Sequence, residues 1–488
     1  MSSMVAEMSR RTPQVSFWTR RKSIDTITAG HADSHQLKKT LSWPHLVALG
    51  VGAIVGTGIY TLTGIGAGLA GPGVILSFLI AGAVCACAAL CYAELSTLMP
   101  AAGSAYTYSY AAMGEQVAWF VGWSLILEYT LVCAAVAVGW SAHAHGLFKL
   151  MGFPDALLAG PHAGGLINLP AVIISMAVAG LLAIGTRESA VVNMVLVAVK
   201  IMALIVFVVL CLPAFDASHF TPFMPNGFSA TPGPDGVKIG VMAAASLIFF
   251  AFYGFDAVST AAEETKNPKR DLTIGIVGSM AACTAIYMIV AAVSIGASRA
   301  EVFSKSEAPL VFILESLSHP KVAQLVALAA VIALPTVILA FMYGQSRIFF
   351  VMARDGLLPR ALSRVNAKTG TPVMMTLLTG ALSALLSGLL SLKDIAELAN
   401  AGTLWAFIAV GASVILLRLR EPNRPRVFST PIWPVVAPAG ILGCLYLFVS
   451  LPVKTQVYFV YAHLIGAAIY LAYGARKSVL AQQEKAAG

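Results

Sequence analysis

The stretch Gly50-Val51-Gly52-Ala53-Ile54-Val55-Gly56-Thr57-Gly58-Ile59-Tyr60 lies in the middle of the first long apolar segment of the chain. Four of its first nine residues are glycine, and each glycine inside a helix weakens that helix by about 1 kcal/mol relative to alanine. In hydrocarbon, a freed backbone N–H or C=O is tolerated only where protein or a water-filled cavity covers it. The stretch therefore predicts a helix that breaks inside a membrane and restarts near residues 56–58.

A restarted helix would present the bare amides of Gly56, Thr57 and Gly58 to a cavity. The N-terminus of a helix binds anions through its N–H groups and macrodipole, and a carboxylate fits such a site. The pair Gly52 and Gly56 also fits a small-residue face for helix packing, which is the alternative. A dinucleotide-binding fingerprint is excluded, because no strand is expected before the glycines and no βαβ unit around them.

The composition indicates a protein with many membrane spans. Of the 488 residues, 58% are hydrophobic and 11% are charged, and the mean hydropathy is +0.83, whereas soluble domains carry about 25% charged residues. The net charge of +9 does not indicate nucleic acid as a partner, because the distribution of Lys and Arg around apolar spans sets membrane orientation. The seven cysteines all fall in apolar segments and are interpreted as packing residues, not disulfides or metal ligands.

A membrane-spanning helix needs about 20 apolar residues. Twelve segments meet this requirement, which predicts an all-α polytopic membrane protein in a lipid bilayer. They are residues 43–67, 72–98, 116–148, 167–185, 190–212, 238–261, 273–297, 322–352, 372–391, 400–418, 434–452 and 456–475. Residues 1–40 hold seven Lys and Arg residues and are expected to form a disordered or surface-lying cytoplasmic tail.

The Lys and Arg residues predict the orientation. When both chain ends lie on one side, 22 of these residues fall on that side and 7 on the other. The positive-inside rule then places both termini in the cytoplasm and predicts a multi-pass protein of the cell membrane. Two basic residues lie within spans. Arg347 is near the cytoplasmic end of its helix and can snorkel, whereas Lys200 is too deep to do so easily.

A second break is predicted in the sixth span, at Phe249-Phe250-Ala251-Phe252-Tyr253-Gly254-Phe255-Asp256, where a glycine stands near a carboxylate. Breaks in spans one and six are typical of an inverted repeat whose binding site lies at mid-membrane. We therefore predict repeats at 41–212 and 238–418, appended helices in 434–475 and a cytoplasmic tail at 476–488. The two halves show no letter-by-letter similarity, so the symmetry rests on the positions of the breaks.

The chain lacks the phosphate-binding pattern Gly-x-x-x-x-Gly-Lys-Ser/Thr, and its loops are too short for a nucleotide-binding domain. Any transport is therefore driven by a gradient or passive. No catalytic residues, resident cofactor or metal site are predicted, so an enzyme is not expected.

Four separated motifs resemble those of the amino acid–polyamine–organocation (APC) superfamily. They are Gly-Ala-Ile-Val-Gly-Thr-Gly-Ile-Tyr at 52–60, Cys91-Tyr92-Ala93-Glu94-Leu95 with Pro100-Ala101-Ala102-Gly103-Ser104-Ala105-Tyr106, Glu263-Glu264-Thr265-Lys266-Asn267-Pro268-Lys269-Arg270, and Ala353-Arg354-Asp355-Gly356-Leu357-Leu358-Pro359. Within the superfamily the chain is most similar to the bacterial branch of the cationic amino acid transporter family, over roughly residues 36–475. The resemblance implies a five-plus-five inverted-repeat fold that works by alternating access.

The resemblance also implies a substrate site. The amides of Gly56, Thr57 and Gly58 would hold the carboxylate of an amino acid, in agreement with the argument from bare N–H groups. The ammonium of the substrate would lie against carbonyls freed in the two breaks. The expected carbonyl donors are Ile54, Phe250, Ala251 and Tyr253. Phe250 matches the position of an aromatic gate over the substrate, and plain packing is the alternative.

Lys200 stands midway along the fifth predicted span, where a lysine costs at least about 2.5 kcal/mol to insert. In sodium-coupled relatives with this architecture, a sodium ion lies between spans one, five and eight. In proton-coupled relatives a lysine of span five takes its place, and Lys200 matches that pattern. Its ammonium would then bridge to carbonyls near Gly50–Ala53, and the coupling ion would be H⁺. The alternative is a structural cation that never titrates.

Two further residues, Asp256 and Glu128, remain open between contact with substrate and structural support. Asp256 lies beside the second break and is expected to hold the loop through hydrogen bonds. Glu128 in span three would face a cationic substrate side chain, relay protons or serve as a structural hydrogen-bonding group. Span eight should line the side-chain pocket around residues 341–343, Phe-Met-Tyr. Bulk there favours small or neutral substrates.

The sequence thus predicts a secondary active amino acid transporter, specifically a proton-coupled symporter. An exchanger is the nearest alternative within transport. A channel is disfavoured, because two broken helices are typical of one occluded site and not of a continuous pore. A nutrient receptor that binds without transporting is a further alternative.

Overall fold

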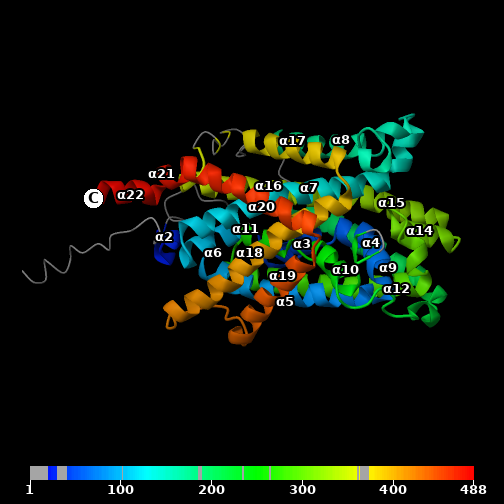
Figure 1. Ribbon diagram of the computed structural model, residues 1–488, viewed down its shortest axis with the longest axis horizontal. Helices are drawn as coiled ribbons and strands as arrows, with labels where there is room; N and C mark the ends of the chain where they lie inside the picture. The colour runs from blue at the N-terminus through cyan, green and yellow to red at the C-terminus, as the bar shows by residue number, and fades with distance from the viewer. Residues whose placement is uncertain are drawn as a thin grey trace, which may run out of the picture.

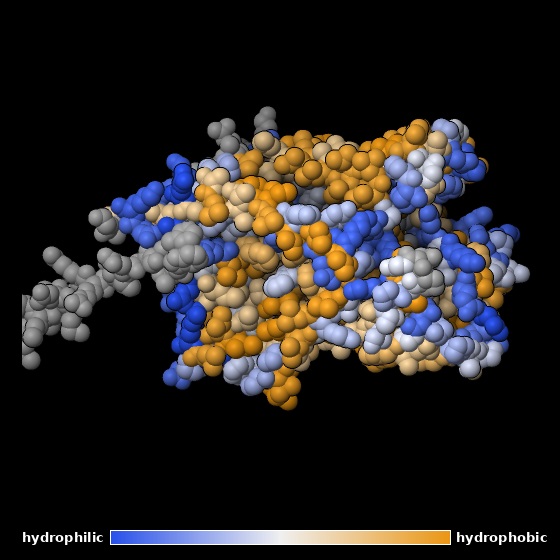
Figure 2. Space-filling view, viewed as in Figure 1, coloured by the Kyte–Doolittle hydropathy of each residue, from blue (hydrophilic) through white to orange (hydrophobic). Residues whose placement is uncertain are grey.

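The computed structural model describes residues 20–29, 41–101, 103–184, 190–233, 236–262, 265–359, 362, 366 and 373–487. Within these ranges the chain is mostly helical, and strand is confined to a two-residue pairing of β1 (Thr231–Pro232) with β2 (Lys238–Ile239). Nine helical stretches of the described chain are long and apolar enough to cross a membrane. Figure 2 shows a hydrophobic band across the middle of the molecule, with hydrophilic residues gathered at both ends. The chain therefore has the surface of a polytopic helical membrane protein.

The first helical stretch, Trp43–Leu98, contains 56 residues. At about 1.5 Å per residue it would extend far beyond a hydrocarbon layer about 30 Å thick. It is interrupted instead. Helix α3 (Trp43–Ile54) ends before the π-helical η2 (Gly58–Leu62), which continues into α4 (Thr63–Ala70). A turn at Gly71–Gly73 then leads into α5 (Val74–Leu98). The predicted break in the first span is present at residues 55–57.

The second predicted break is also present. Helix α10 (Val241–Ile248) runs into the short η8 (Phe249–Ala251), and α11 (Phe255–Thr260) begins after Gly254. A third interruption was not predicted. The segment expected at 322–352 consists of α15 (Pro320–Ala333) and α16 (Pro335–Arg354). Pro335 lacks the N–H that would continue the helical ladder, which explains the change of helix at this position.

The remaining long helices match the expected segments with shifts of at most six residues at their ends, except that α18 begins eight residues earlier than expected. They are α7 (Glu115–Leu150), α8 (Leu169–Ile184), α9 (Ala190–Cys211), α12 (Pro268–Ala297), α17 (Val373–Leu389), α18 (Leu392–Arg420), α19 (Trp433–Ser450) and α20 (Val453–Ile469). The short helix α6 (Ser104–Ala112) and the pair α13 (Ala300–Phe303) and α14 (Pro309–Ser316) lie between the expected spans. Of the four motifs, Ala102, Glu263 and Glu264 lie outside the described residues.

The interrupted helices occupy the centre of the bundle. Helix α12 packs against α3 and α5, α7 packs against α16 and α18, and α11 contacts α3. In Figure 1, α3, α10 and α11 lie inside the molecule, whereas α17 and α8 form a pair at its edge. Every residue of the stretch Val241–Thr260, which contains the second break, is buried. The breaks are therefore shielded from lipid, as freed backbone groups require.

The sequence predicts a disordered or surface-lying N-terminal tail, and the described part of it, residues 20–29, is ordered against the bundle. Residues Ile24–Ala29 form helix α2, and Arg20 is only 7% exposed. Four ion pairs and apolar contacts of Ile24 and Ile27 fix this segment on the bundle. Figure 1 shows α2 at the same end of the molecule as α21 (Ala475–Lys477) and α22 (Val479–Ala487), close to the C-terminus.

Candidate functional site

The two breaks touch each other through their backbones. A Cβ atom added to Gly58 would lie 2.4 Å from the Cα of Ala251, so only glycine permits this approach. On the other side of the crossing, Gly254 has φ +125° and a Cβ added there would lie 2.9 Å from the carbonyl carbon of Ala53. Because real Cβ atoms do not approach so closely, each break needs a glycine at the point where it meets the backbone of the other break. The structure thus brings together two segments about 190 residues apart in the sequence.

The three backbone N–H groups that are expected to bind an anion are not used in helical hydrogen bonds. The first helical bonds after the break run from the N–H groups of Ile59 and Tyr60 to the carbonyl of Gly56. The N–H groups of Gly56, Thr57 and Gly58 donate no hydrogen bond to any other part of the chain that the structure describes. The hydroxyl of Thr57 is likewise fully buried and has no partner among described residues. A helix terminus with unpaired donors is suited to a carboxylate.

The second break supplies acceptors. Within the described chain, the carbonyls of Phe250, Ala251 and Tyr253 accept no hydrogen bond. The carbonyl of Ile54 differs from the expectation, because the hydroxyl of Tyr287 already donates to it at 2.7 Å. One lone pair of that oxygen remains for a further donor. The crossing therefore presents N–H donors on one side and C=O acceptors on the other.

Asn400 of α18, which supports the second break, was not identified from the sequence. Its amide donates to the carbonyls of Ser246 and Leu247 at 2.7 and 3.0 Å. These carbonyls belong to the last turn of α10, where the ladder ends without partners. An asparagine within a predicted apolar span was the available signal, because buried polar groups in membranes are normally hydrogen-bonded. Asn400 stabilises the second break from outside the cavity.

A small cavity lies where the breaks cross. Its volume is about 10 Å³, which is enough for about one water molecule. The lining residues come from both breaks and from α7 and α16; they are Ala53, Ile54, Gly56, Thr57, Gly58, Val132, Val136, Phe250, Tyr253, Val337 and Phe341. Six of the seven predicted substrate-binding residues line it, and the seventh, Ala251, contacts Gly58. A molecule larger than water can enter only if the lining side chains move.

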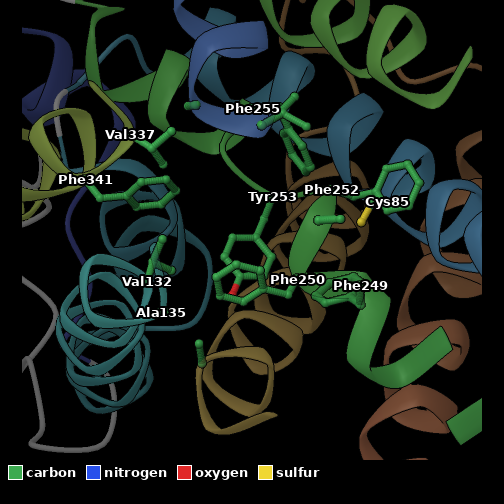
Figure 3. Packing of buried hydrophobic residues seen from close by; sticks show 14 of the residues in the cluster. Cys85, Val132, Ala135, Phe249, Phe250, Phe252, Tyr253, Phe255, Val337 and Phe341 are labelled. Carbon is green, nitrogen blue, oxygen red and sulfur yellow. The ribbon is translucent and has the colours of Figure 1, made fainter. Parts of the chain in front are cut away.

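Aromatic and branched side chains form the apolar wall of this cavity. Figure 3 shows Phe250 and Tyr253 of the second break facing Phe341 and Val337 of α16, with Val132 of α7 beside them. The rings of Phe250 and Tyr253 meet edge-on at 5.0 Å, and Tyr253 lies 6.5 Å from Phe341. No Asp, Glu, Lys or Arg lines the cavity within the described chain.

The expectation for span eight is correct only in part. Phe341 lines the cavity, but Met342 and Tyr343 do not. The guanidinium of Arg347 instead lies over the ring of Tyr343, and its Cζ atom is 3.1 Å from the ring centroid. The helical period explains the difference, because adjacent residues of a helix point in different directions. Val337, one turn before Phe341, lines the cavity and was missed for the same reason.

Lys200 of α9 is fully buried and joins three elements. Its ammonium donates to the carbonyl of Gly52 in α3 at 2.9 Å and to the hydroxyl of Thr336 in α16 at 3.1 Å. The hydroxyl of Thr336 in turn donates to the carbonyl of Ala333 at 2.7 Å. The ammonium therefore lies between the first, fifth and eighth expected spans, and it contacts the Gly50–Ala53 segment as the resemblance implied. Thr336 was not identified from the sequence.

The two intramembrane carboxyl groups differ in their surroundings. Asp256 accepts hydrogen bonds from the amide of Gly254 at 3.0 Å and from the hydroxyl of Tyr129 at 2.7 Å. It thereby holds the turn of the second break. Glu128 is fully buried in α7, and neither of its oxygens has a hydrogen-bond partner among described residues. Glu128 and Asp256 do not line the cavity.

A network of ion pairs lies at the end of the molecule where α2 and α22 are found. Arg20 donates to Glu484 at 2.6 Å and forms a longer pair with Glu115 at 3.4 Å. Tyr110 and Tyr470 also donate to Glu115. Burial would lower the pKa of Arg20, but the hydrogen bond to Glu484 and the charges of both carboxylates outweigh it and raise the pKa. Arg20 therefore remains a cation that joins the N-terminal segment to α22.

Together these features define a class: a multi-pass helical membrane protein in which two interrupted helices cross at a small buried cavity. Residues 41–473 match the family described as amino acid permease. The chain belongs to this family, which is part of the APC superfamily.

Two named relatives align along nearly the whole chain, and a third aligns along most of it. It is 43% identical over 469 residues to the branched-chain amino acid permease BcaP of Bacillus subtilis (strain 168), with 95% of this chain and 99% of the relative covered. It is 38% identical to the methylthioribose transporter of the same organism, with 94% and 98% covered. It is also 39% identical to the vacuolar cationic amino acid transporter 2 of Arabidopsis thaliana, with 83% of this chain and 63% of the relative covered.

Proposed function

We propose that this protein is a secondary active amino acid transporter of the bacterial cell membrane that couples uptake to protons and works by alternating access. The observation that carries the proposal is the crossing of the two breaks, with unpaired N–H groups at Gly56–Gly58 opposite unpaired carbonyls at Phe250–Tyr253. An amino acid carries a carboxylate and an ammonium group on one carbon atom. The crossing offers N–H groups to the carboxylate and C=O groups to the ammonium.

The proposed fold has twelve membrane crossings. Support comes from the nine long apolar stretches, from the division of Trp43–Leu98 at its turn, and from the shorter apolar helices Leu169–Ile184 and Val373–Leu389. The two breaks occupy equivalent places in two halves of five helices, at 41–212 and 238–418. This placement favours an inverted repeat around a site at mid-membrane, with two appended helices and both termini in the cytoplasm.

The proposed substrates are neutral amino acids with small or branched apolar side chains. The cavity wall of Val132, Val136, Val337 and Phe341 carries no charge that would pair with a cationic side chain. A branched side chain would contact the valines, with a gain of about 0.8 kcal/mol per buried methylene. The name of the relative BcaP agrees with this preference, whereas the names of the plant relatives indicate cationic substrates for those proteins.

The proposed cycle uses the aromatic side chains as a gate. The cavity is too small for an amino acid, so Phe250 and Tyr253 must move before substrate reaches the amides. Their rings would close again over the bound molecule. Such a closed site disfavours a channel, which needs a continuous aqueous path. A receptor that binds without transport would share the site but not the cycle.

Lys200 is the proposed coupling group. Its ammonium ties α3 to α16 through Gly52 and Thr336, directly before the first break. In the proposed cycle, loss of the proton removes one donor from these bonds and weakens the tie between the elements, so that α3 can move. An exchanger remains the second candidate, because the same tie would serve obligatory exchange if Lys200 never released its proton.

Uptake into proteoliposomes distinguishes these functions. Leucine, valine, alanine and arginine would be tested with the pH lower outside than inside, and again without a gradient. We expect accumulation of neutral amino acids that requires the gradient. Uptake only when amino acid is present on the opposite side would support the exchanger, and binding without uptake would support a receptor.

A further inference from the structure

A second cavity of the described chain lies away from the crossing of the breaks. It has a volume of about 270 Å³ and is a cleft between α7 and α20. Its wall includes Trp119, Phe120, Trp123, His463, Gly466 and Tyr470. The proposed transport mechanism uses none of these residues, so the cleft calls for a separate explanation.

The ring nitrogens of this wall are already hydrogen-bonded within the protein. The indole N–H groups of Trp119 and Trp123 donate to the carbonyls of Gly466 and Ala462 at 2.9 and 2.8 Å. The ring nitrogens of His463 bond to Ser124 and to the carbonyl of Phe459. The surface left for a ligand therefore consists mainly of ring faces and small aliphatic groups, which water wets poorly.

The cleft opens on the lipid-facing side of the bundle. Leu464, Ile465 and Leu471 of this part of the chain are about 60% exposed, and Figure 2 shows mainly hydrophobic surface along α20. Acyl chains of the bilayer surround this surface. An acyl chain would fill the cleft without loss of hydrogen bonds and would bury apolar area of the rings.

Two basic residues follow the lining of the cleft in the chain. Arg476 and Lys477 of α21 are exposed and lie five and six residues beyond Leu471, which lines the cleft. Neither forms an ion pair with any other residue in the described ranges. The nearby carboxylates of Glu115 and Glu484 are both engaged by Arg20. Basic residues at the membrane surface attract anionic lipid headgroups.

We infer that the cleft between α7 and α20 is a binding site for an anionic phospholipid. One acyl chain lies against Trp119 and Trp123, and the phosphate lies beside Arg476 and Lys477. The site is adjacent to the network at the chain termini, because Tyr470 lines the cleft and donates to Glu115, the partner of Arg20. Bound lipid would hold Tyr470 in this arrangement. The site is independent of the proposed transport function.

Binding can be measured by native mass spectrometry of the purified full chain with phosphatidylglycerol or phosphatidylethanolamine added in detergent. The matched variants are Ala467→Leu, which fills the cleft, and Ala468→Leu, which changes an exposed neighbour outside it. We expect Ala467→Leu to lower the occupancy of phosphatidylglycerol about tenfold and Ala468→Leu to leave it unchanged. Equal occupancy in the two variants would overturn the site.

The headgroup is tested with a second pair of variants. Arg476→Gln with Lys477→Gln should weaken phosphatidylglycerol binding about tenfold and abolish the preference over phosphatidylethanolamine. Lys269→Gln with Arg270→Gln, an exposed basic pair at the start of α12, is the control. The proposal fails if both pairs behave alike. It also fails if Ala467→Leu converts a lipid-free dimer into a monomer, because a second copy of the chain would then occupy the cleft.

Discussion

The ammonium of Lys200 lies 2.9 Å from the carbonyl oxygen of Gly52, four residues before Gly56. This contact connects the only lysine deep in an expected span to the segment that carries the unpaired amides. In the proposed cycle, a change in the protonation of Lys200 would therefore act directly on α3 and its break. The contact with Thr336 extends the same link to α16, which supplies Val337 and Phe341 to the cavity.

The first prediction concerns coupling. Lys200→Ala should bind substrate but lose accumulation driven by a pH gradient, and Lys200→Arg should fail similarly because arginine does not deprotonate in proteins. With pH ~5.5 outside and ~7.5 inside, each proton supplies about 2.7 kcal/mol, or up to about 100-fold accumulation of a neutral substrate. Uptake into proteoliposomes would show a fall toward no accumulation in both variants.

Thr336→Ser, which keeps the hydroxyl, is the control and should retain coupling. Normal acid-driven accumulation by Lys200→Ala would transfer the proton role to Glu128 or Asp256.

The second prediction concerns the crossing of the breaks. Gly58→Ala places a Cβ within 2.4 Å of the Ala251 backbone, and such overpacking costs about 1–3 kcal/mol. We expect lower thermal stability and loss of substrate binding. Gly146→Ala in α7 has nothing within 4 Å of the added atom and should be neutral or stabilising by up to about 1 kcal/mol. Wild-type binding by Gly58→Ala would show that the backbones separate in the binding state.

The third prediction concerns ligand chemistry. If the amides of Gly56, Thr57 and Gly58 hold a carboxylate, isobutylamine should bind far more weakly than valine. Loss of one charge-assisted set of hydrogen bonds corresponds to about 1.5–3 kcal/mol, or roughly 10- to 150-fold. Competition against radiolabelled valine measures the difference. Valinol, which also keeps the amine but lacks the carboxylate, is the second probe. Equal competition by valine and both analogues would exclude the carboxylate site.

The fourth prediction concerns the network at the termini. Arg20→Ala removes bonds to Glu115, Glu484 and the carbonyl of Ala475, and should destabilise the protein by about 1–3 kcal/mol. Cleavage by trypsin at Lys477 and Lys485 should become faster because α22 loses its anchor. The control Arg424→Ala breaks pairs with Asp25 and Glu421, whose side chains are 81% and 40% exposed, and should cost less than about 1 kcal/mol. Identical cleavage of the two variants would contradict the anchoring role.

The fifth prediction concerns orientation. Lys266→Cys and Lys305→Cys both place an exposed thiol at a described surface position. In intact cells an impermeant maleimide should label the cysteine at 305, and should label the one at 266 only after the membrane is opened. All seven native cysteines are buried or half-buried, so background labelling should be low. Labelling of position 266 from outside would reverse the topology.

Much of the fold followed from local properties of the sequence. Apolar segments of about 20 residues predicted the long helices, because a bilayer accepts only helices whose backbone groups are paired within the segment. The glycines at 50–58 and the Gly254-Phe255-Asp256 turn predicted both breaks, because glycine weakens a helix wherever it stands. The resemblance of four motifs predicted the family. The match of residues 41–473 to the amino acid permease family confirmed it.

Tertiary structure decided what each residue touches. The sequence could not show that Gly58 lies on Ala251 and Gly254 on Ala53, because these contacts depend on how segments distant in sequence pack. It also could not separate Phe341, which lines the cavity, from Met342 and Tyr343, since helix rotation sets which side chain points inward. The partners Thr336 and Asn400 and the anchoring of Arg20 were missed for the same reason. The apolar pattern determines which segments enter the membrane, whereas packing between helices determines which of their groups meet.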